Sequence, residues 1–120
     1  MGFTKYGISY NIFDGEELLE DSILQIRDLV EYISVVFQRE SYWGNKCSAN
    51  LIETLNRLKR EGLIDDLVEY TNSPQLSPHY NQINKRNIGI ELSKRNYCTH
   101  HMSMDCDEFY VEEQFANLLA

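Results

Sequence analysis

Apolar and polar side chains alternate strictly between residues 6 and 13, near the start of the chain. The apolar positions are Tyr6, Ile8, Tyr10 and Ile12. A period of two residues is typical of a β-strand with two different faces. Asp14-Gly15 ends the pattern, and we expect Asp14 to cap a helix with Glu17 as its capping-box partner. The chain is therefore expected to open with a strand and a helix in close succession.

Three segments repeat apolar residues every three or four positions, which is the spacing of one helix face. These residues are Leu19, Ile23, Ile26 and Val30; Leu51, Leu55 and Leu58; and Val111, Phe115 and Leu118. Ser48 stands where it can cap the second of these helices, and Gly62 where it can end it. Residues 81–95 also suit a helix, although their apolar periodicity is weaker.

Short strand-like segments separate the helices at residues 33–37, 66–71 and 99–104. Strands and helices thus alternate along residues 1–120, which we interpret as one domain. Alternation of this kind implies right-handed crossovers and a parallel sheet covered by helices. We therefore expect an α/β fold, Rossmann-like, with an open and mainly parallel sheet and helices on both faces.

The composition and the net charge exclude some classes of protein and of partner. The chain of 120 residues is 42% hydrophobic, 12% aromatic and 25% charged, which is ordinary for a globular domain and excludes a disordered chain. Its formal net charge is −8, and no basic patch interrupts the acidity. Because binding to a nucleic-acid backbone depends on clustered Lys and Arg, we expect no nucleic-acid partner.

The cysteines and the lengths of the apolar runs indicate the cellular compartment of the protein. Cys47, Cys98 and Cys106 are odd in number and form no CxxC pair, which favours a reducing compartment over a disulfide framework. Residues 1–10 do not form a signal peptide, and no run approaches the roughly 20 apolar residues of a membrane span. We expect a cytoplasmic protein without a transmembrane segment.

Ligands of open parallel sheets bind beyond the carboxyl ends of the strands. The last predicted strand ends in Asp105-Cys106-Asp107, where two carboxylates one residue apart would point to the same side. Two close carboxylates repel unless a cation lies between them, and their oxygens suit Mn²⁺ or Mg²⁺. The alternative is a solvated acidic turn after a strand.

Two stretches around this motif resemble the core of family-2-like glycosyltransferases. Residues 84–89 read NKRNIG, and after a helix residues 98–109 read CTHHMSMDCDEF. In that family an Arg-Asn-x-Gly helix precedes a strand that ends in Asp-x-Asp. Residues 8–11, ISYN, followed by residues 16–19, EELL, are also similar to the first strand and helix of the same GT-A fold. The resemblance covers about residues 5–115, and the joint occurrence of its parts is more specific than Asp-x-Asp alone.

The resemblance implies roles at the phosphate end of a bound nucleotide sugar. Asp107 would coordinate Mn²⁺ or Mg²⁺, which bridges the diphosphate of the donor. Asp105 would lie near the ribose or share the metal. Arg86 would face the donor with a fixed positive charge, and Asn87 would anchor the adjoining loop.

Five further residues are expected at the other end of the nucleotide. They are Tyr10, Asn11, Glu17, Gln38 and Ser41. The resemblance implies that Tyr10 and Asn11 line the base and ribose pocket, with Glu17 near it. The family commonly carries an Asp after the second strand to read the base, whereas this chain has Gln38, followed by Ser41. Because an amide both donates and accepts hydrogen bonds, Gln38 can still bind the edge of a base.

The implied function is transfer of a sugar from a metal-bound nucleoside-diphosphate sugar to a glycan or another hydroxyl acceptor. In the family the acceptor site lies downstream of Asp-x-Asp, so we expect the acceptor-binding part to be absent from this chain. One alternative is a metal-dependent phosphohydrolase that uses Asp105, Asp107 and a histidine. Another is a non-catalytic donor-binding or assembly module. A second copy or another chain would then contact the helical stripe that contains Phe115.

Two aromatic sites leave alternatives open. Trp43 lies with Tyr42 in a polar loop over residues 38–47, where it either stacks on a base or sugar or anchors the loop. His100 and His101 are adjacent in a predicted strand and therefore face opposite sides. We expect one of these histidines to be half-buried with its hydrogen bonds satisfied and the other to lie at the surface.

Overall fold

The computed structural model describes residues 4–41 and 43–105. Strands and helices alternate along these residues, as the sequence predicts. They are β1 (Tyr6–Ile12), α1 (Glu16–Ile26), the 3₁₀ helix η1 (Arg27–Leu29), β2 (Tyr32–Phe37), α2 (Ala49–Arg60), β3 (Asp66–Glu69), α3 (Pro78–Arg95) and β4 (His100–Asp105). The helix expected around Val111 lies outside the described residues.

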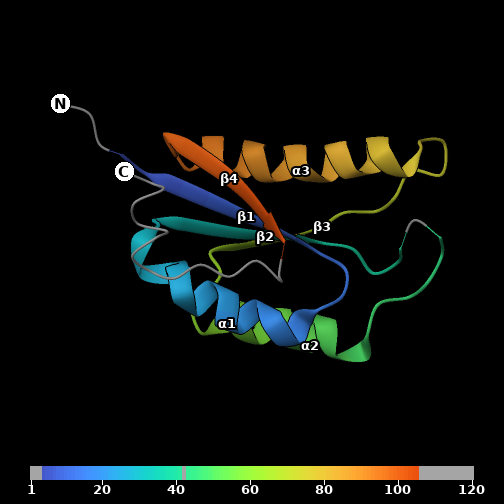
Figure 1. The fold of residues 1–120 in the computed structure, drawn as a ribbon, viewed down its shortest axis with the longest axis horizontal. Coiled ribbons are helices and arrows are strands. Elements are labelled where there is room, and N and C mark those ends of the chain that lie inside the picture. The colour runs from blue at the N-terminus through green and yellow to red at the C-terminus, as the bar shows by residue number, and fades with distance from the viewer. Residues whose placement is uncertain (1–3, 42, 106–120) are drawn as a thin grey trace.

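The four strands form one sheet in the order β3-β2-β1-β4, and each neighbouring pair is parallel. Helices α1 and α2 cover one face of the sheet, and α3 covers the other (Figure 1). The predicted α/β class, with a parallel sheet and helices on both faces, is therefore confirmed. Because β2 lies on one side of β1 and β4 on the other, the topological switch point falls between β1 and β4.

The face of the sheet under α1 and α2 holds the apolar core. Its fully buried side chains include Ile8, Tyr10, Ile33, Leu19, Ile23, Leu51, Leu55 and Leu58. Burial of one large aliphatic side chain contributes roughly 1.5–3 kcal/mol. The two predicted helix stripes therefore account for the packing of α1 and α2 against the sheet.

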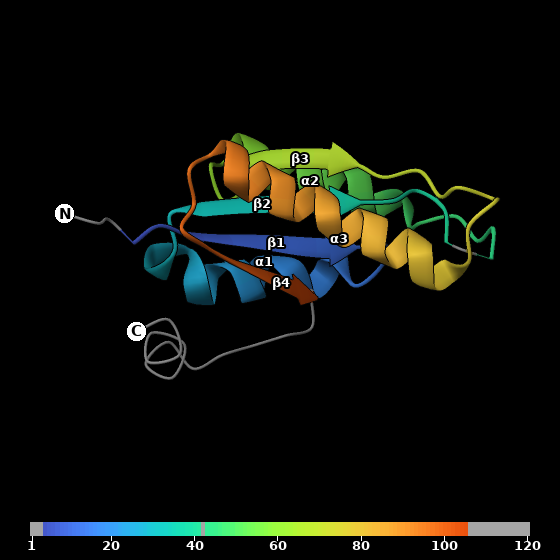
Figure 2. The same cartoon turned by 90° about the horizontal axis from the view of Figure 1, so that it is seen from above.

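On the opposite face of the sheet, the α3 residues that point inward are small or polar. The buried residues of α3 are Asn81, Lys85, Gly89 and Ser93, each four positions after the last. A Cβ added at Gly89 would lie only 2.5 Å from the Cβ of Ser9, so the glycine allows α3 to approach β1 closely. This polar inward face explains the weak apolar periodicity of α3. Figure 2 shows α3 running back along the strands, so that its first turn lies where the strands end.

Several boundaries differ from the expectation, among them the starts of α1 and α3 and the end of β3. The N-cap of α1 is Gly15 and not Asp14, because Gly15 adopts a left-handed conformation with φ of 81° and supplies no capping side chain. Helix α3 begins at Pro78 rather than at residue 81, since the Ser77 hydroxyl caps its first turn and proline suits the first helical position. Strand β3 ends at Glu69, two residues earlier than expected.

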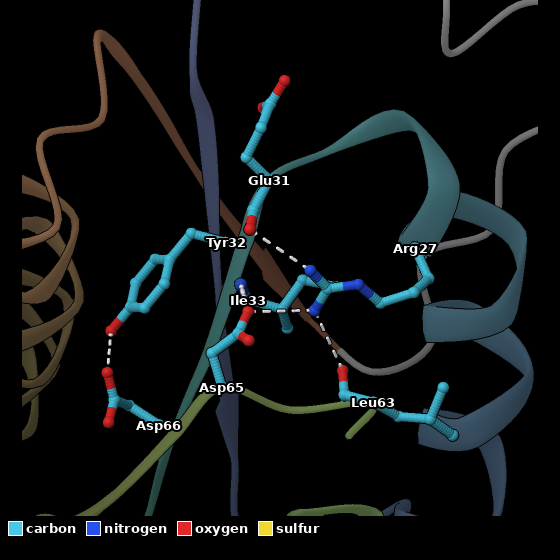
Figure 3. A network of polar contacts seen from close by, with 7 residues as sticks. All are labelled: Arg27, Glu31, Tyr32, Ile33, Leu63, Asp65 and Asp66. Atoms are coloured by element: carbon cyan, nitrogen blue, oxygen red, sulfur yellow. Dashed lines mark hydrogen bonds and ion pairs between the residues drawn. The ribbon is translucent and has the colours of Figure 1, made fainter. Parts of the chain in front are cut away.

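A hydrogen-bonded network joins the elements at the amino ends of the strands (Figure 3). Arg27 pairs with Asp65 at 3.0 Å and also donates to the carbonyl oxygen of Leu63 at 3.3 Å. The same Asp65 carboxylate accepts the backbone N–H of Ile33 at 2.8 Å. The end of α1 is thus tied to β2 and β3 at the edge of the sheet that lies away from the carboxyl ends.

Within the described ranges, no helix combines the length and the apolar character that a bilayer crossing requires. Cys47 and Cys98 are free thiols, and Cys106 is not among the described residues.

Candidate functional site

The carboxyl ends of β1 and β4 bring Asn11 and Asp105 side by side. The two residues are register partners on neighbouring parallel strands, so their side chains share the α3 face of the sheet. Asp105 is exposed, whereas Asn11 is only 7% exposed. The structure thus places these two predicted residues together at the switch point, where ligands of open α/β sheets bind.

The Asn11 amide is buried without compensation. Neither its Oδ1 nor its Nδ2 finds a hydrogen-bond partner within the part of the chain that the structure describes. Leaving a buried polar group unpaired costs roughly 1–3 kcal/mol. Because such groups are rare in folded proteins, an unpaired amide at a switch point points to a site that takes a polar ligand.

Lys85 reaches the same region from α3. It is 4% exposed, and its Nζ donates to the carbonyl oxygen of Ile12, the last residue of β1, at 3.3 Å. The backbone N–H of Gln38 donates to the same oxygen at 3.2 Å. A buried ammonium is expensive unless anionic or polar groups surround it. Its position therefore supplies positive charge where β1 and β2 end.

The resemblance implies that Arg86 carries this charge, whereas the buried basic side chain of α3 is Lys85. Arg86 and Asn87 are both exposed on α3, while Lys85 occupies the inward position. Each residue advances a helix by about 100°, so neighbouring positions cannot share the face that meets the sheet. The usable signal in the sequence is the run of small and polar residues at four-residue spacing that includes Asn81, Lys85 and Gly89.

Tyr10 and Glu17 also lie elsewhere than expected. Tyr10 is fully buried in the apolar core, and its hydroxyl shares a 2.8 Å hydrogen bond with Ser22, so it offers no surface to a ligand. Alternation along β1 causes this outcome, because residues 10 and 11 point to opposite faces. Glu17 is exposed on α1 and lines a groove towards Arg57 of α2, in the layer away from α3.

A polar cleft of about 710 Å³ continues the site past the ends of β2 and β3. The segments after these two strands and the first turn of α3 line it, and we call it the β2–β3 cleft. Its charged lining residues balance, with Arg39 and Lys46 against Glu40 and Glu69. Arg39 Nε pairs with Glu69 Oε2 at 3.1 Å. The cleft is thus polar without a large net charge.

Ser41 and Gln38 both belong to this region, in different ways. Ser41 lines the cleft, and its hydroxyl accepts the backbone N–H groups of Trp43 and Asn45 at 3.2 and 3.0 Å. Gln38 is 3% exposed, and its Nε2 donates to the carbonyl oxygen of Glu40 at 2.8 Å. Gln38 therefore supports the loop that carries Ser41 and is not among the residues that line the cleft.

Asn81 organises the wall of the cleft, a role that the sequence did not reveal. It is 2% exposed, and its Oδ1 accepts the Tyr70 hydroxyl at 2.6 Å and the Ser73 N–H at 2.8 Å. Its Nδ2 lies within 3.1–3.2 Å of the carbonyl oxygens of Ser73, Leu76 and Ser77. One buried amide thus fixes the segment between β3 and α3.

The metal prediction falls only in part on described residues. Asp107 lies outside them, and within residues 4–41 and 43–105 no group of three or more His, Cys, Asp or Glu side chains could hold a metal ion. Asp105 and the Asn11 amide oxygen are nevertheless hard oxygen donors of the kind that Mn²⁺ and Mg²⁺ prefer. These ions commonly take only one or two protein carboxylates and complete their shell with phosphate oxygens and water.

The histidines follow the expectation. His100 is exposed, and His101 is half-buried, with Nδ1 at 2.7 Å from the Ser93 hydroxyl and Nε2 at 3.3 Å from that of Ser103. Burial lowers the pKa of His101 below its ordinary value. His101 lies four positions before Asp105 on β4, which is about 13 Å along the strand.

No protein-family model, no curated protein and no solved structure matches this chain.

Proposed function

We propose that this chain is the donor-binding domain of a GT-A-type glycosyltransferase. It binds a nucleoside-diphosphate sugar together with Mn²⁺ or Mg²⁺ and contributes to transfer of the sugar to a hydroxyl acceptor. The observation that carries the proposal is the pairing of Asn11 with Asp105 at the switch point of a parallel sheet, with the Lys85 ammonium at the end of β1. Open α/β sheets bind nucleotides at this place.

The charges suit a diphosphate that arrives with a metal ion. A chain of net charge −8 repels an anion, so local positive charge must offset the repulsion. Lys85 provides such a charge at the end of β1. Asp105 and Asp107 would hold the metal, which supplies Lewis-acid stabilisation to the departing diphosphate. Lys85 would stabilise the same negative charge from the end of β1.

The β2–β3 cleft fits the uncharged end of the donor. Its lining is balanced in charge and rich in hydroxyl and amide groups, which suits a base and a ribose better than a phosphate. Two interstrand spacings separate the cleft from the crevice between β1 and β4, or about 10 Å. A nucleoside diphosphate spans such a distance with its base in the cleft and its phosphates beside Lys85.

The phosphohydrolase alternative receives less support from the geometry. It requires a histidine beside Asp105, whereas His101 lies about 13 Å away along β4 and bonds to Ser93. A non-catalytic donor-binding module differs from the proposal only in the transfer step. A sugar-transfer assay with nucleotide sugars would separate these two outcomes once donor binding is measured.

Calorimetric titration with the diphosphates of uridine, guanosine, adenosine and cytidine tests the proposal. We expect at least one to bind in the presence of Mn²⁺ and to bind much more weakly after the metal is removed. Lys85→Met should weaken binding roughly 10- to 150-fold, since a hydrogen bond to a charged group contributes about 1.5–3 kcal/mol. Arg86→Ala is the matched control, because it removes a neighbouring but exposed charge from α3.

Two results would contradict the proposal. One is the absence of binding by every diphosphate with either metal. The other is equal loss of affinity in Arg86→Ala and Lys85→Met, which would mean that general charge rather than the inward-facing amine attracts the nucleotide.

Asp105→Asn should reduce the metal dependence while leaving the fold intact, because Asp105 is exposed.

A further inference from the structure

The loop after β2 is held in a fixed backbone conformation. Glu40 and Lys46 form an antiparallel bridge, and the N–H of Ser41 donates to the Asn45 carbonyl oxygen at 2.7 Å. Gly44 closes the turn with φ of 85°, a left-handed conformation that favours glycine. The Ser41 hydroxyl accepts two backbone N–H groups, including that of Trp43. Backbone and hydroxyl hydrogen bonds of the described residues therefore hold this loop.

Trp43 stands on this loop with 81% of its surface exposed. An aromatic anchor must bury its ring, so the exposure excludes the interpretation that Trp43 holds the loop in place. An exposed indole is free to contact a molecule outside the chain, through its apolar ring and its N–H donor.

The position of Trp43 relates it to the β2–β3 cleft. Ser41 and Gly44, two residues before and one residue after Trp43, both line the cleft. The backbone that carries the indole therefore lies at the rim of the cleft. The opposite wall is fixed by Asn81 through its bonds to Tyr70 and Ser73. A flat ring that entered the cleft would meet hydrogen-bonding groups of its lining, and the adjoining loop would bring the indole close to the exposed side of the ring.

We propose that Trp43 stacks on the nucleobase of the bound donor and closes the mouth of the β2–β3 cleft. This inference rests on the proposed function, because it assigns the base to the cleft and the phosphates to Lys85. The lining of the cleft has balanced charge, which favours a base over a phosphate. Every base presents a π-face, so stacking on an indole supplies affinity with little selection among bases.

Trp43 is the only tryptophan of the chain, so its fluorescence reports on this one site. We expect the emission to change when a nucleoside diphosphate binds with Mn²⁺ and to stay constant with inorganic pyrophosphate, which lacks a base. Trp43→Ala should weaken nucleoside diphosphate binding about 5- to 150-fold, while Trp43→Phe should retain most of the affinity. Binding of the variants is measured by calorimetry, and far-UV circular dichroism in urea verifies that they fold.

Tyr97→Asn is the matched control. Tyr97 is also an exposed aromatic residue, at 86%, but it follows α3 near the amino end of β4 and has a positive φ that asparagine tolerates. Replacing it should leave nucleotide affinity unchanged. A loss of affinity in Tyr97→Asn equal to that in Trp43→Ala would overturn the inference.

The remaining outcomes separate this inference from the proposed function. If a diphosphate binds with Mn²⁺ while the emission and the affinity of Trp43→Ala are unchanged, the stacking role is wrong and the donor-binding proposal stands. If no diphosphate binds, both fail. If a free monosaccharide changes the emission and a nucleoside does not, the cleft takes a sugar ring and the assignment to the base is overturned.

Discussion

Replacing Gly89 by alanine tests how closely α3 approaches the sheet. In most helix interiors this change stabilises a protein by roughly 0.8–1.0 kcal/mol, because alanine has the higher helix propensity. Here the added Cβ would lie 2.5 Å from the Ser9 Cβ and would also overlap the Ser9 hydroxyl. Overpacking of this kind costs typically 1–3 kcal/mol. We expect a net loss of stability between about 0 and 2 kcal/mol.

Gly89→Ala should stabilise rather than destabilise the protein when the Ser9 side chain is also removed. Ser9→Gly deletes both atoms that crowd the new methyl group, and the next nearest atom, His101 Cε1, is then at an ordinary contact distance of 3.7 Å. In that background Gly89→Ala should stabilise the protein by about 1 kcal/mol, which is the helix propensity alone. The coupling between the two positions should therefore be about 1–3 kcal/mol.

Urea unfolding of the parent, the two single variants and the double variant measures this coupling. Asn87→Ala serves as the control, since the residue is exposed on the same helix and the change should be mildly stabilising. Additive effects of Gly89→Ala and Ser9→Gly, or stabilisation by Gly89→Ala alone, would refute the close approach. The inward position of Lys85, one turn earlier on α3, would then lose its structural basis.

Three other predictions concern stability. Leu55→Ala should cost about 2–5 kcal/mol in urea unfolding, because it leaves a cavity in the apolar layer; a cost under 1 kcal/mol would contradict the packing. Ser48→Ala should cost about 1 kcal/mol through the lost cap of α2, and less if the cap is not formed. Because burial lowers the pKa of His101, the unfolded state takes up its proton first as the pH falls. Stability should therefore fall as the pH drops below about 6.5 and should be insensitive to His101 above it; His101→Asn should reduce this dependence, whereas the exposed His100→Asn should not.

The helices that carry an apolar face were predictable. The stripes containing Leu19 and Leu55 face the sheet as expected, because burial of aliphatic side chains dominates their packing. Which side of α3 faces the sheet was not predictable, because that side carries no apolar stripe. It consists of Asn81, Lys85, Gly89 and Ser93. The order of the strands also lay outside the local pattern. It depends on β4 returning to the free side of β1 rather than to β3.

The candidate site shows the same division. Asn11 and Asp105 were predictable because they end strands, and the parallel sheet brings strand ends together. A motif in the sequence does not reveal which side of a helix meets the sheet, so the buried position of Lys85 rather than Arg86 was not predictable. The close approach of Gly89 to Ser9 fixes which side of α3 faces the sheet, and Lys85 lies on that same side. The resemblance placed Tyr10 beside Asn11 in a pocket, but alternation along β1 buries its ring in the core, where its hydroxyl bonds to Ser22.

Paramagnetic broadening of amide signals by Mn²⁺ tests the central claim most directly, because it locates the metal with its nucleotide on the structure. Backbone amide spectra are recorded with the tightest-binding nucleoside diphosphate, first with Mg²⁺ and then with a small fraction of Mn²⁺. We expect selective loss of the signals of Asn11, Ile12 and Asp105, while Ile33 and Asp65 at the opposite edge remain sharp. Uniform broadening, or broadening centred on another part of the protein, would contradict a nucleotide site between β1 and β4.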